Sequence, residues 1–125
     1  MKSLYYGLAM SLFSTMLCAH EFTPTYPKFK PSFIDDASVT TMKLWNKRSD
    51  VRYYEVTVFN SEWKPIPFAT VHRLIKLGYN NQVKFDIYVK NNNVRNVTYI
   101  CTTSKQLNED VKSTGVKSRI CSKVK

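Results

Sequence analysis

The residues whose chemistry is simplest to assign are two cysteines, Cys101 and Cys121, which lie 20 positions apart. In an oxidising compartment cysteines at such a spacing pair, and closing a loop of about 20 residues stabilises a fold by roughly 3 kcal/mol. We therefore expect a disulfide between them. The alternatives are two free thiols, or half of a metal site that would need more ligands than His20 and His72 supply.

Residues suited to catalysis are few. His72 stands alone in a predicted strand, and the carboxylate pairs Asp35-Asp36 and Glu109-Asp110 fall in predicted turns, where acidic residues cap and solubilise. With three glycines, the chain has no Gly-rich phosphate loop. We expect no catalytic residues, no metal, no cofactor and no small-molecule substrate. A small hydrolase, in which a carboxylate and a histidine converge in a pocket, is the alternative.

The N-terminus has the pattern of a secretory signal peptide. A basic residue precedes an uncharged, largely apolar run over 4–17, and the small residue Ala19 follows. This run is shorter than the about 20 residues that a membrane-spanning helix needs. We expect 1–19 to be removed, so that a single domain, 20–125, is exported to the periplasm or secreted and meets the membrane only through its signal peptide. A lipid on Cys18 is disfavoured, because a large residue precedes it.

The chain is strongly basic, with 19 Lys and Arg against 9 Asp and Glu and a net charge of +10. Such a protein adheres to anionic surfaces. Nucleic acid is disfavoured as the partner, because an exported protein first meets lipid headgroups, envelope polysaccharide and acidic proteins. A scattered charge that only keeps the domain soluble is the alternative.

Alternating apolar and polar residues predict β-strands through most of the domain. The clearest alternation runs over 83–90, where Val83, Phe85, Ile87 and Val89 share one face. Similar patterns over 38–46, 52–59, 71–77, 97–103 and 116–124 are separated by turn residues, and 104–114 is expected to be a loop. About seven short strands at this spacing predict an all-β fold, a sandwich of two antiparallel sheets.

Two local signals concern the predicted strand over 97–103. If it pairs antiparallel with 116–124, Cys101 and Cys121 face each other at a separation that a disulfide tolerates. Tyr99, two residues before Cys101, fits the tyrosine that closes a corner of immunoglobulin-like sandwiches by a hydrogen bond to upstream backbone. An antibody-type bridge is not indicated, because its cysteines lie about 60 residues apart.

The last predicted strand has two chemically different faces. Cations would point to solvent as a basic stripe, and apolar residues would form an edge-strand face. The stripe consists of Lys117, Arg119, Lys123 and the terminal Lys125; the apolar face consists of Val116, Ile120 and Val124. The stripe could bind an anionic partner or only guard the edge against unwanted strand pairing. The apolar face could be offered to a partner or fill the domain's own core.

The order of these segments resembles the N-terminal immunoglobulin-like domain of periplasmic pilus chaperones, the PapD-like family. The resemblance rests on an opening strand, a strand ending in asparagine, a long strand ending in an aromatic residue, a Pro-containing crossing, a following turn and strand, and an arginine four residues before an aromatic. In the same order, the opening strand is at 22–25, the strand ending in asparagine at 44–46 and the long strand at 53–59. The crossing is at 66–70, the turn at 75–78, the strand after it at 82–87, and the arginine and aromatic are Arg95 and Tyr99. Short proteins of this kind also resemble exported proteins of bacteriophages.

The family resemblance implies a binding fold without the family's clamp. Chaperones of the family hold a subunit's terminal carboxylate with an arginine and a lysine, but the corresponding positions are Tyr26 and Cys121. The resemblance also implies binding by strand addition, in which a partner pairs with an exposed sheet edge. We therefore expect an exported, non-enzymatic module that binds a protein partner or the anionic envelope surface. A divergent chaperone for surface subunits and a basic binder of envelope polymers are the alternatives.

Overall fold

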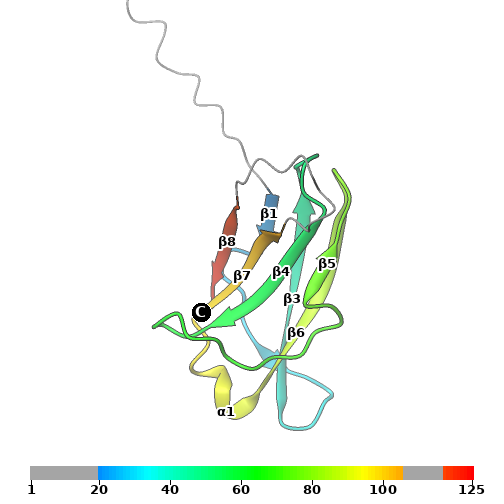
Figure 1. Ribbon diagram of the computed structural model, residues 1–125. Helices are drawn as coiled ribbons and strands as arrows, with labels where there is room; N and C mark the ends of the chain where they lie inside the picture. Colours follow the sequence, from blue (N-terminus) through cyan, green and yellow to red (C-terminus); the bar gives the residue numbers. More distant parts are fainter. Residues whose placement is uncertain (1–19, 106–116) are drawn as a thin grey trace, which may run out of the picture.

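The computed structural model describes residues 20–105 and 117–125, which form two antiparallel β-sheets around a shared core (Figure 1). The predicted sandwich is thereby confirmed. In chain order the elements are β1 (His20–Thr23), β2 (Lys30–Pro31), β3 (Ala37–Asn46), β4 (Tyr53–Phe59), β5 (Leu74–Lys76), β6 (Gln82–Lys90), α1 (Asn91–Val94), β7 (Tyr99–Lys105) and β8 (Arg119–Lys123). No helix among these residues is long and apolar enough to cross a membrane.

The first sheet is built around β3, the longest strand. Strand β6 pairs with β3 along almost its whole length, from Ala37 opposite Lys90 to Trp45 opposite Gln82. The other side of β3 is shared by two short strands, β1 against its C-terminal half and β2 against its N-terminal half. The second sheet has the order β5-β4-β7-β8, so β5 and β8 are its edges.

The core lies between the sheets and is filled by the residues that the alternation predicted to point inward. Met42 and Leu44 of β3 are fully buried. On β4, alternate side chains point inward and are buried: Tyr54, Val56 and Val58. Ile87 and Val89 of β6 are buried as well, while Val83 and Phe85 are partly buried against the same cluster.

Several predicted boundaries were wrong. The strand expected over 71–77 is only the three residues of β5, because Val71 and His72 are exposed and form no ladder. One of the expected connections between strands, after β6, contains the short helix α1. The strand expected from residue 97 begins at Tyr99, because Val97 fills the core from a connection rather than from a strand. Most of the expected loop over 104–114 lies outside the described residues.

Candidate binding surface

The hydrogen bonds between β7 and β8 involve the even-numbered residues of β8. The N–H of Ser104 donates to the carbonyl oxygen of Ser118 at 2.9 Å, and the N–H of Val124 donates to that of Thr98 at 2.9 Å. In an antiparallel pair, such residues alternate with residues whose backbone groups point to the opposite side. The odd-numbered N–H and C=O groups of β8 therefore point away from β7, toward the edge of the sheet.

The segment that follows β1 covers the C-terminal half of this edge. The N–H of Lys123 donates to the carbonyl oxygen of Thr25 at 3.0 Å, and the N–H of Lys125 donates to that of Pro27 at 3.1 Å. Since β1 pairs with β3, the chain leaves the first sheet after Thr23 and joins the second. Pro27 has no N–H to donate in return, so this pairing is one-sided.

The other half of the edge, at Arg119 and Cys121, is open as far as residues 20–105 and 117–125 are concerned. Among residues 20–105 and 117–125, no hydrogen bond reaches the outward backbone N–H or C=O groups of these two residues. Unpaired groups on an edge strand can accept a further strand. This open half of β8 is the feature that fits the strand addition expected from the sequence.

The disulfide lies on the outer face of the second sheet. Cys101 and Cys121 are directly opposite each other, with their Cα atoms 4.1 Å apart, and are joined by an S–S bond. They occupy one row across the sheet with Thr57. Arg119 and Phe59 flank this row, and the Arg119 guanidinium lies 5.3 Å from the centroid of the Phe59 ring. Because these two side chains reach across the row, Cys101 is fully buried on an outer face.

The expected basic stripe is divided in the structure. Lys117, Arg119, Lys123 and Lys125 are exposed, but the half-buried Cys121 separates Arg119 from Lys123. The Lys125 ammonium lies 5.0 Å from the centroid of the Tyr26 ring.

The apolar residues of the last strand point inward. Ile120 and Val124 are partly buried and pack against the domain's own core. They are therefore not available to a partner in this structure. Val116, the third residue of the expected edge-strand face, lies outside the described residues.

Tyr99 is held by ring contacts rather than by the expected corner hydrogen bond. Its ring stacks on that of Trp63, with centroids 4.1 Å apart and planes 5° apart, and Phe59 lies 5.6 Å from Trp63. In the described part of the chain, the hydrogen bonds from side chains to backbone carbonyl oxygens come from other residues and not from the Tyr99 hydroxyl. The reason is its register: opposite Phe59 and Lys123, Tyr99 lies on the outer face of the sheet.

Trp63 has an unfavourable backbone conformation. It ends a tight loop in which its N–H donates to the carbonyl oxygen of Asn60 and the N–H of Asn60 donates to that of Lys64, both at 3.0 Å. Its φ is 62°, in the left-handed region, where this kind of loop normally has glycine. A side chain there costs about 1–2 kcal/mol. No sequence pattern predicts this arrangement, because a tryptophan in a turn does not indicate a left-handed residue.

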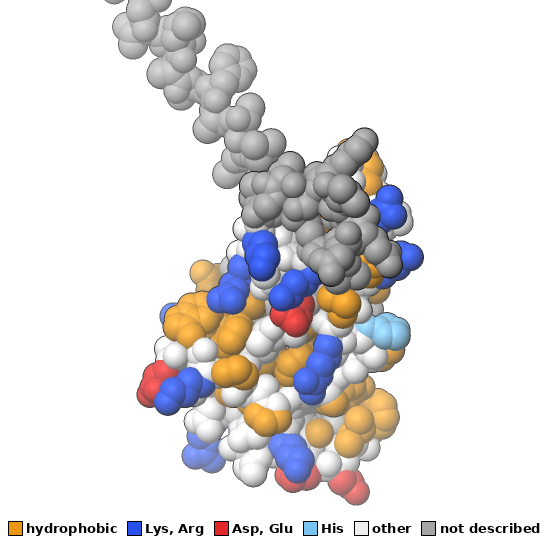
Figure 2. Space-filling model, viewed as in Figure 1, with side chains coloured by type: hydrophobic (Ala, Val, Ile, Leu, Met, Phe, Trp, Pro, Cys, Tyr) orange, Lys and Arg blue, Asp and Glu red, His pale blue; other side chains and the backbone are white. Residues whose placement is uncertain are grey.

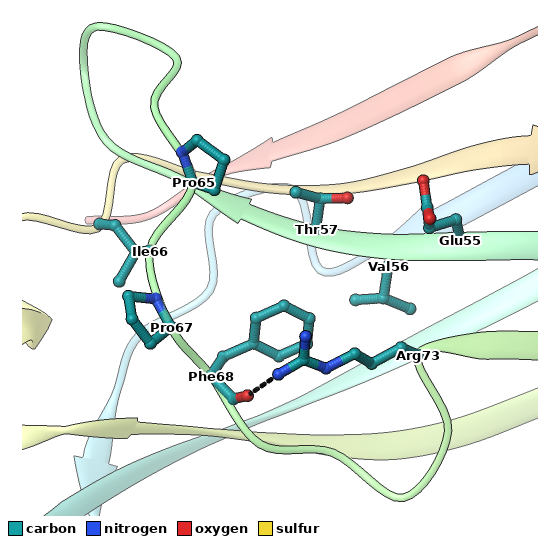
Figure 3. Close-up of a pocket in the computed structure, with 8 residues that line it drawn as sticks. All are labelled: Glu55, Val56, Thr57, Pro65, Ile66, Pro67, Phe68 and Arg73. Carbon is teal, nitrogen blue, oxygen red and sulfur yellow. Dashed lines mark hydrogen bonds between the residues drawn. The ribbon is translucent and has the colours of Figure 1, made fainter.

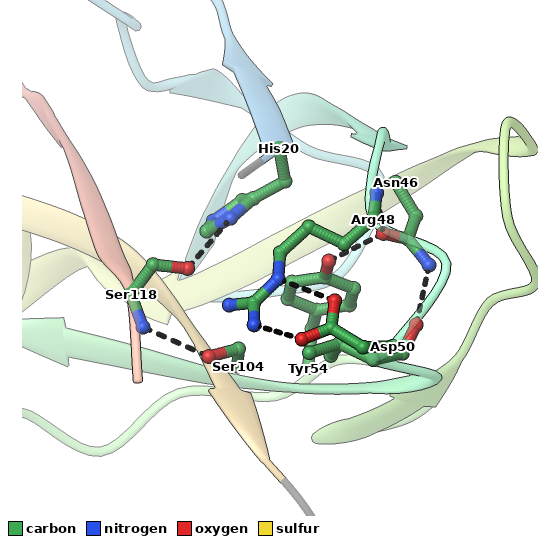
Figure 4. Close-up of polar contacts among 8 residues, drawn as sticks. His20, Asn46, Arg48, Asp50, Tyr54, Ser104 and Ser118 are labelled. Atoms are coloured by element: carbon green, nitrogen blue, oxygen red, sulfur yellow. Dashed lines mark hydrogen bonds and ion pairs between the residues drawn. The ribbon is translucent and has the colours of Figure 1, made fainter. Parts of the chain in front are cut away.

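A polar cluster joins the two sheets at the other end of β8 (Figure 4). His20 is almost fully buried; its Nε2 lies 3.0 Å from Thr102 Oγ1 and its Nδ1 lies 3.3 Å from Ser118 Oγ. Burial lowers the pKa of His20 to about 4, and the nearby Arg48 acts in the same direction. The imidazole is therefore neutral at pH 7. This role was not predicted from the sequence, although the alternation of His20 and Phe22 with Glu21 and Thr23 was a signal for it.

Next to His20, the side chain of Asn46 makes four hydrogen bonds. Its amide nitrogen donates to the carbonyl oxygens of Val51 at 2.7 Å and Leu77 at 2.8 Å. Its amide oxygen accepts from the Tyr54 hydroxyl at 2.5 Å and from the N–H of Arg48 at 2.9 Å. Burial raises the pKa of Tyr54 to about 12. Every polar atom of this buried amide is paired, which is the arrangement of a structural residue.

A salt bridge closes this cluster at the surface. The Arg48 guanidinium makes two contacts with the Asp50 carboxylate. Its Nε donates to Oδ1 at 2.8 Å, and a terminal nitrogen pairs with Oδ2. This hydrogen bond raises the pKa of Arg48. His20, Arg48 and Asp50 lie close together, but they adjoin no described cavity.

A pocket between β4 and the segment over 65–68 is lined by a carboxylate and a cation (Figure 3). It encloses about 540 Å³ between β4 and the crossing segment, with Glu55 and Arg73 at its margin. Glu55 pairs with Lys105 at 3.4 Å, and Arg73 donates to the carbonyl oxygen of Phe68 at 2.9 Å while lying over the Phe68 ring. Both charged groups are thus engaged by the protein, and no histidine lines the pocket.

The remaining sequence candidates are spread over the surface. His72 is exposed, and Asp35 and Asp36 lie in the connection between β2 and β3. Glu109 and Asp110 lie outside the described residues. Within the described ranges, no three His, Cys, Asp or Glu side chains are grouped in a way that could hold a metal ion.

Comparison with known proteins identifies the fold. No family model and no curated protein sequence matches the chain. Among solved structures, the E. coli chaperone DraB is similar with a TM-score of 0.62 and 15% identity, over 84% of this chain and 52% of DraB. The PapD-like (ASH) domain 7 of human CEP192 has a TM-score of 0.56 and 10% identity, over 85% of this chain and 82% of that one.

The fold is PapD-like and immunoglobulin-like. The PapD-like domain spans about half the length of DraB. Neither clamp position expected from the family carries a cation, since Tyr26 is an exposed aromatic and Cys121 is in the disulfide.

Proposed function

We propose that this PapD-like domain is a non-enzymatic binding module, exported after removal of 1–19, that pairs an extended segment of a partner protein with the open half of β8. The observation that carries the proposal is the row of outward backbone groups at Arg119 and Cys121. Among the described residues, the segment after β1 pairs with this edge at Lys123 and Lys125 and not at these two residues. A partner strand would continue the sheet there.

The fold and the disulfide support this proposal. One of the similar structures is that of a chaperone, and the domain shares its fold. The bond between Cys101 and Cys121 fixes β8 to β7, so the open edge keeps one register and is rigid before a partner arrives. A rigid edge lowers the entropy lost on binding.

A proline at position 119 tests the proposal. The N–H of Arg119 points away from β7, so Arg119→Pro removes an outward donor without removing a β7–β8 hydrogen bond. Arg119→Gln is the matched control, because it removes the charge and keeps the N–H.

A photo-crosslinking residue at 119 identifies the partner in producing cells. The same residue placed at Lys84, on the other sheet, serves for comparison. The purified partner should then bind Arg119→Pro about tenfold more weakly and Arg119→Gln as wild type.

Amide hydrogen exchange gives a second measurement. In the free domain the amides of Arg119 and Cys121 should exchange faster than those of Ile120 and Ser122, and the partner should slow the first pair. If Arg119→Pro binds as wild type and the two amides stay unprotected in the complex, strand addition is wrong.

An anionic surface is the competing partner, because Lys117 and Arg119 are both exposed here. In that case Lys117→Glu with Arg119→Glu would weaken binding, and added salt would weaken wild-type binding steeply. Binding that resists salt and survives this double substitution supports strand addition.

A further inference from the structure

An aromatic platform lies on the outer face of the second sheet, at the end of β4. It consists of Phe59, Trp63 and Tyr99. The Trp63 ring stacks on the Tyr99 ring, contacts Phe59 and is about half exposed. Figure 2 looks onto this face and shows hydrophobic side chains gathered at one side, with Lys and Arg and a few Asp or Glu side chains beside them. The open edge at Arg119 and Cys121 is a separate feature, made of backbone groups.

Two cations lie beside this platform, and the carboxylate of its loop is already paired. Arg119 lies over Phe59, and Lys123 is opposite Tyr99 in the register. Within the described ranges neither forms an ion pair. The carboxylate of the platform loop, Glu62, is 3.5 Å from its own partner Lys64. The surface is therefore positively charged and suited to an anionic ligand.

A polar pocket lies beside the loop that carries Trp63. It encloses about 440 Å³ between the loop over 60–65 and the segment over 93–98, with Arg95 at its wall. Side-chain amides and hydroxyls make up much of its lining: Asn60, Ser61, Asn93, Asn96 and Thr98. One carboxylate, Glu62, also lines it, and this carboxylate lies 3.5 Å from the ammonium of Lys64. In the described structure no hydrogen bond occupies the amides of Asn93 and Asn96, so both can bind a ligand.

These features match the chemistry of a sugar acid. The C–H bonds on one face of a sugar ring pack against the negative face of an aromatic ring. Its hydroxyls both donate and accept, as an asparagine amide does, and its acidic group pairs with a guanidinium. An apolar ligand would leave these amides without partners, which is costly.

We propose that Trp63 and the polar pocket beside it form a binding site for an anionic saccharide, with Arg95, Arg119 and Lys123 receiving its acidic groups. The left-handed backbone of Trp63 agrees with this assignment, because glycine would relieve the conformation and leave no ring on the platform. Backbone strain of this kind is concentrated at binding sites. The site goes beyond the proposed strand addition and does not depend on it.

Titration calorimetry with a hexamer of a uronic acid tests the proposal, with a neutral glucose hexamer of equal length for comparison. We expect saturable binding of the acidic hexamer that weakens with salt, and at least tenfold weaker binding of the neutral one. Trp63→Gly, which relaxes the loop, should fold and lose at least tenfold in affinity. Asn93→Ala and Arg95→Gln should each weaken binding severalfold. Phe33→Ala and Lys84→Glu, an exposed aromatic and an exposed cation elsewhere, should bind as wild type.

The emission of Trp63 gives an independent readout. In a Trp45→Phe background the remaining tryptophan should respond to the acidic hexamer. No binding of that hexamer, or equal binding by folded Trp63→Gly, would overturn the proposal. Tighter binding of a thymidylate hexamer than of the uronic acid hexamer would overturn it too, since bases also stack on aromatic side chains, and would indicate a nucleic-acid site.

Discussion

The side chains of His20 and Ser118 meet between the two sheets, although they are 98 positions apart in the sequence. Ser118 Oγ lies 3.3 Å from one ring nitrogen of His20, and Thr102 Oγ1 lies 3.0 Å from the other. The imidazole thus joins β1 to the second sheet through two hydroxyls. This contact makes the start of the domain sensitive to protonation.

We predict that the domain loses stability in moderate acid because of His20. Its pKa falls from 6.5 to about 4 on folding, so between these values the unfolded chain binds a proton that the folded chain does not. The stabilising contribution is complete above pH 6.5 and is lost as the pH falls toward 4. The full loss is about 3 kcal/mol.

Urea unfolding between pH 4 and 7.5 measures this effect. His20→Gln should flatten the profile, whereas His72→Gln, which alters an exposed histidine, should leave it unchanged. A profile of His20→Gln that falls as steeply as wild type would assign the acid sensitivity to other groups.

The disulfide should contribute strongly to stability. It closes a separation of 20 residues and lies under Arg119 and Phe59. Replacing Cys101 and Cys121 together by alanine should lower the free energy of unfolding by about 2–5 kcal/mol. Denaturant titration measures the change, and a thiol reagent should label wild type only after unfolding and reduction. Labelling of the unreduced, denatured protein would show that the two thiols are free.

Asn46 should be among the polar residues most sensitive to substitution. Asn46→Ala leaves two buried carbonyl oxygens, a buried hydroxyl and an N–H without their partner, and should cost about 3–5 kcal/mol. Tyr54→Phe removes only one of these bonds and should cost about 1 kcal/mol. Asn92→Ala, at an exposed position of α1, is the control. Equal losses for Asn46→Ala and Asn92→Ala would contradict the assigned role.

Sequence patterns predicted the parts of the fold in which one residue in two is buried. Met42 and Leu44, or Tyr54 and Val56, reveal their strands because period-2 burial is a local property of the chain. The pairing of Cys101 with Cys121 was predictable for the same reason, since the two strands that carry them follow each other in sequence.

Contacts between distant segments were not predictable in this way. The cover of β8 by Thr25 and Pro27 depends on the chain changing sheets, which no local pattern records. The stack of Trp63 on Tyr99 depends on the left-handed backbone of Trp63, and its neighbours in sequence give no reason for that conformation. The open edge and the aromatic platform therefore became visible only in the structure.

Export should remove residues 1–19 from the chain. Signal cleavage after Ala19 would give a mature chain that starts with His20, the first residue of β1. His20 is buried opposite Asn46, so cleavage even one residue later would remove the imidazole that joins the sheets. Intact mass of protein recovered outside the cytoplasm should correspond to 20–125 with two hydrogens lost to the disulfide. A mass that retains 1–19, or that includes acyl chains on Cys18, would contradict the prediction.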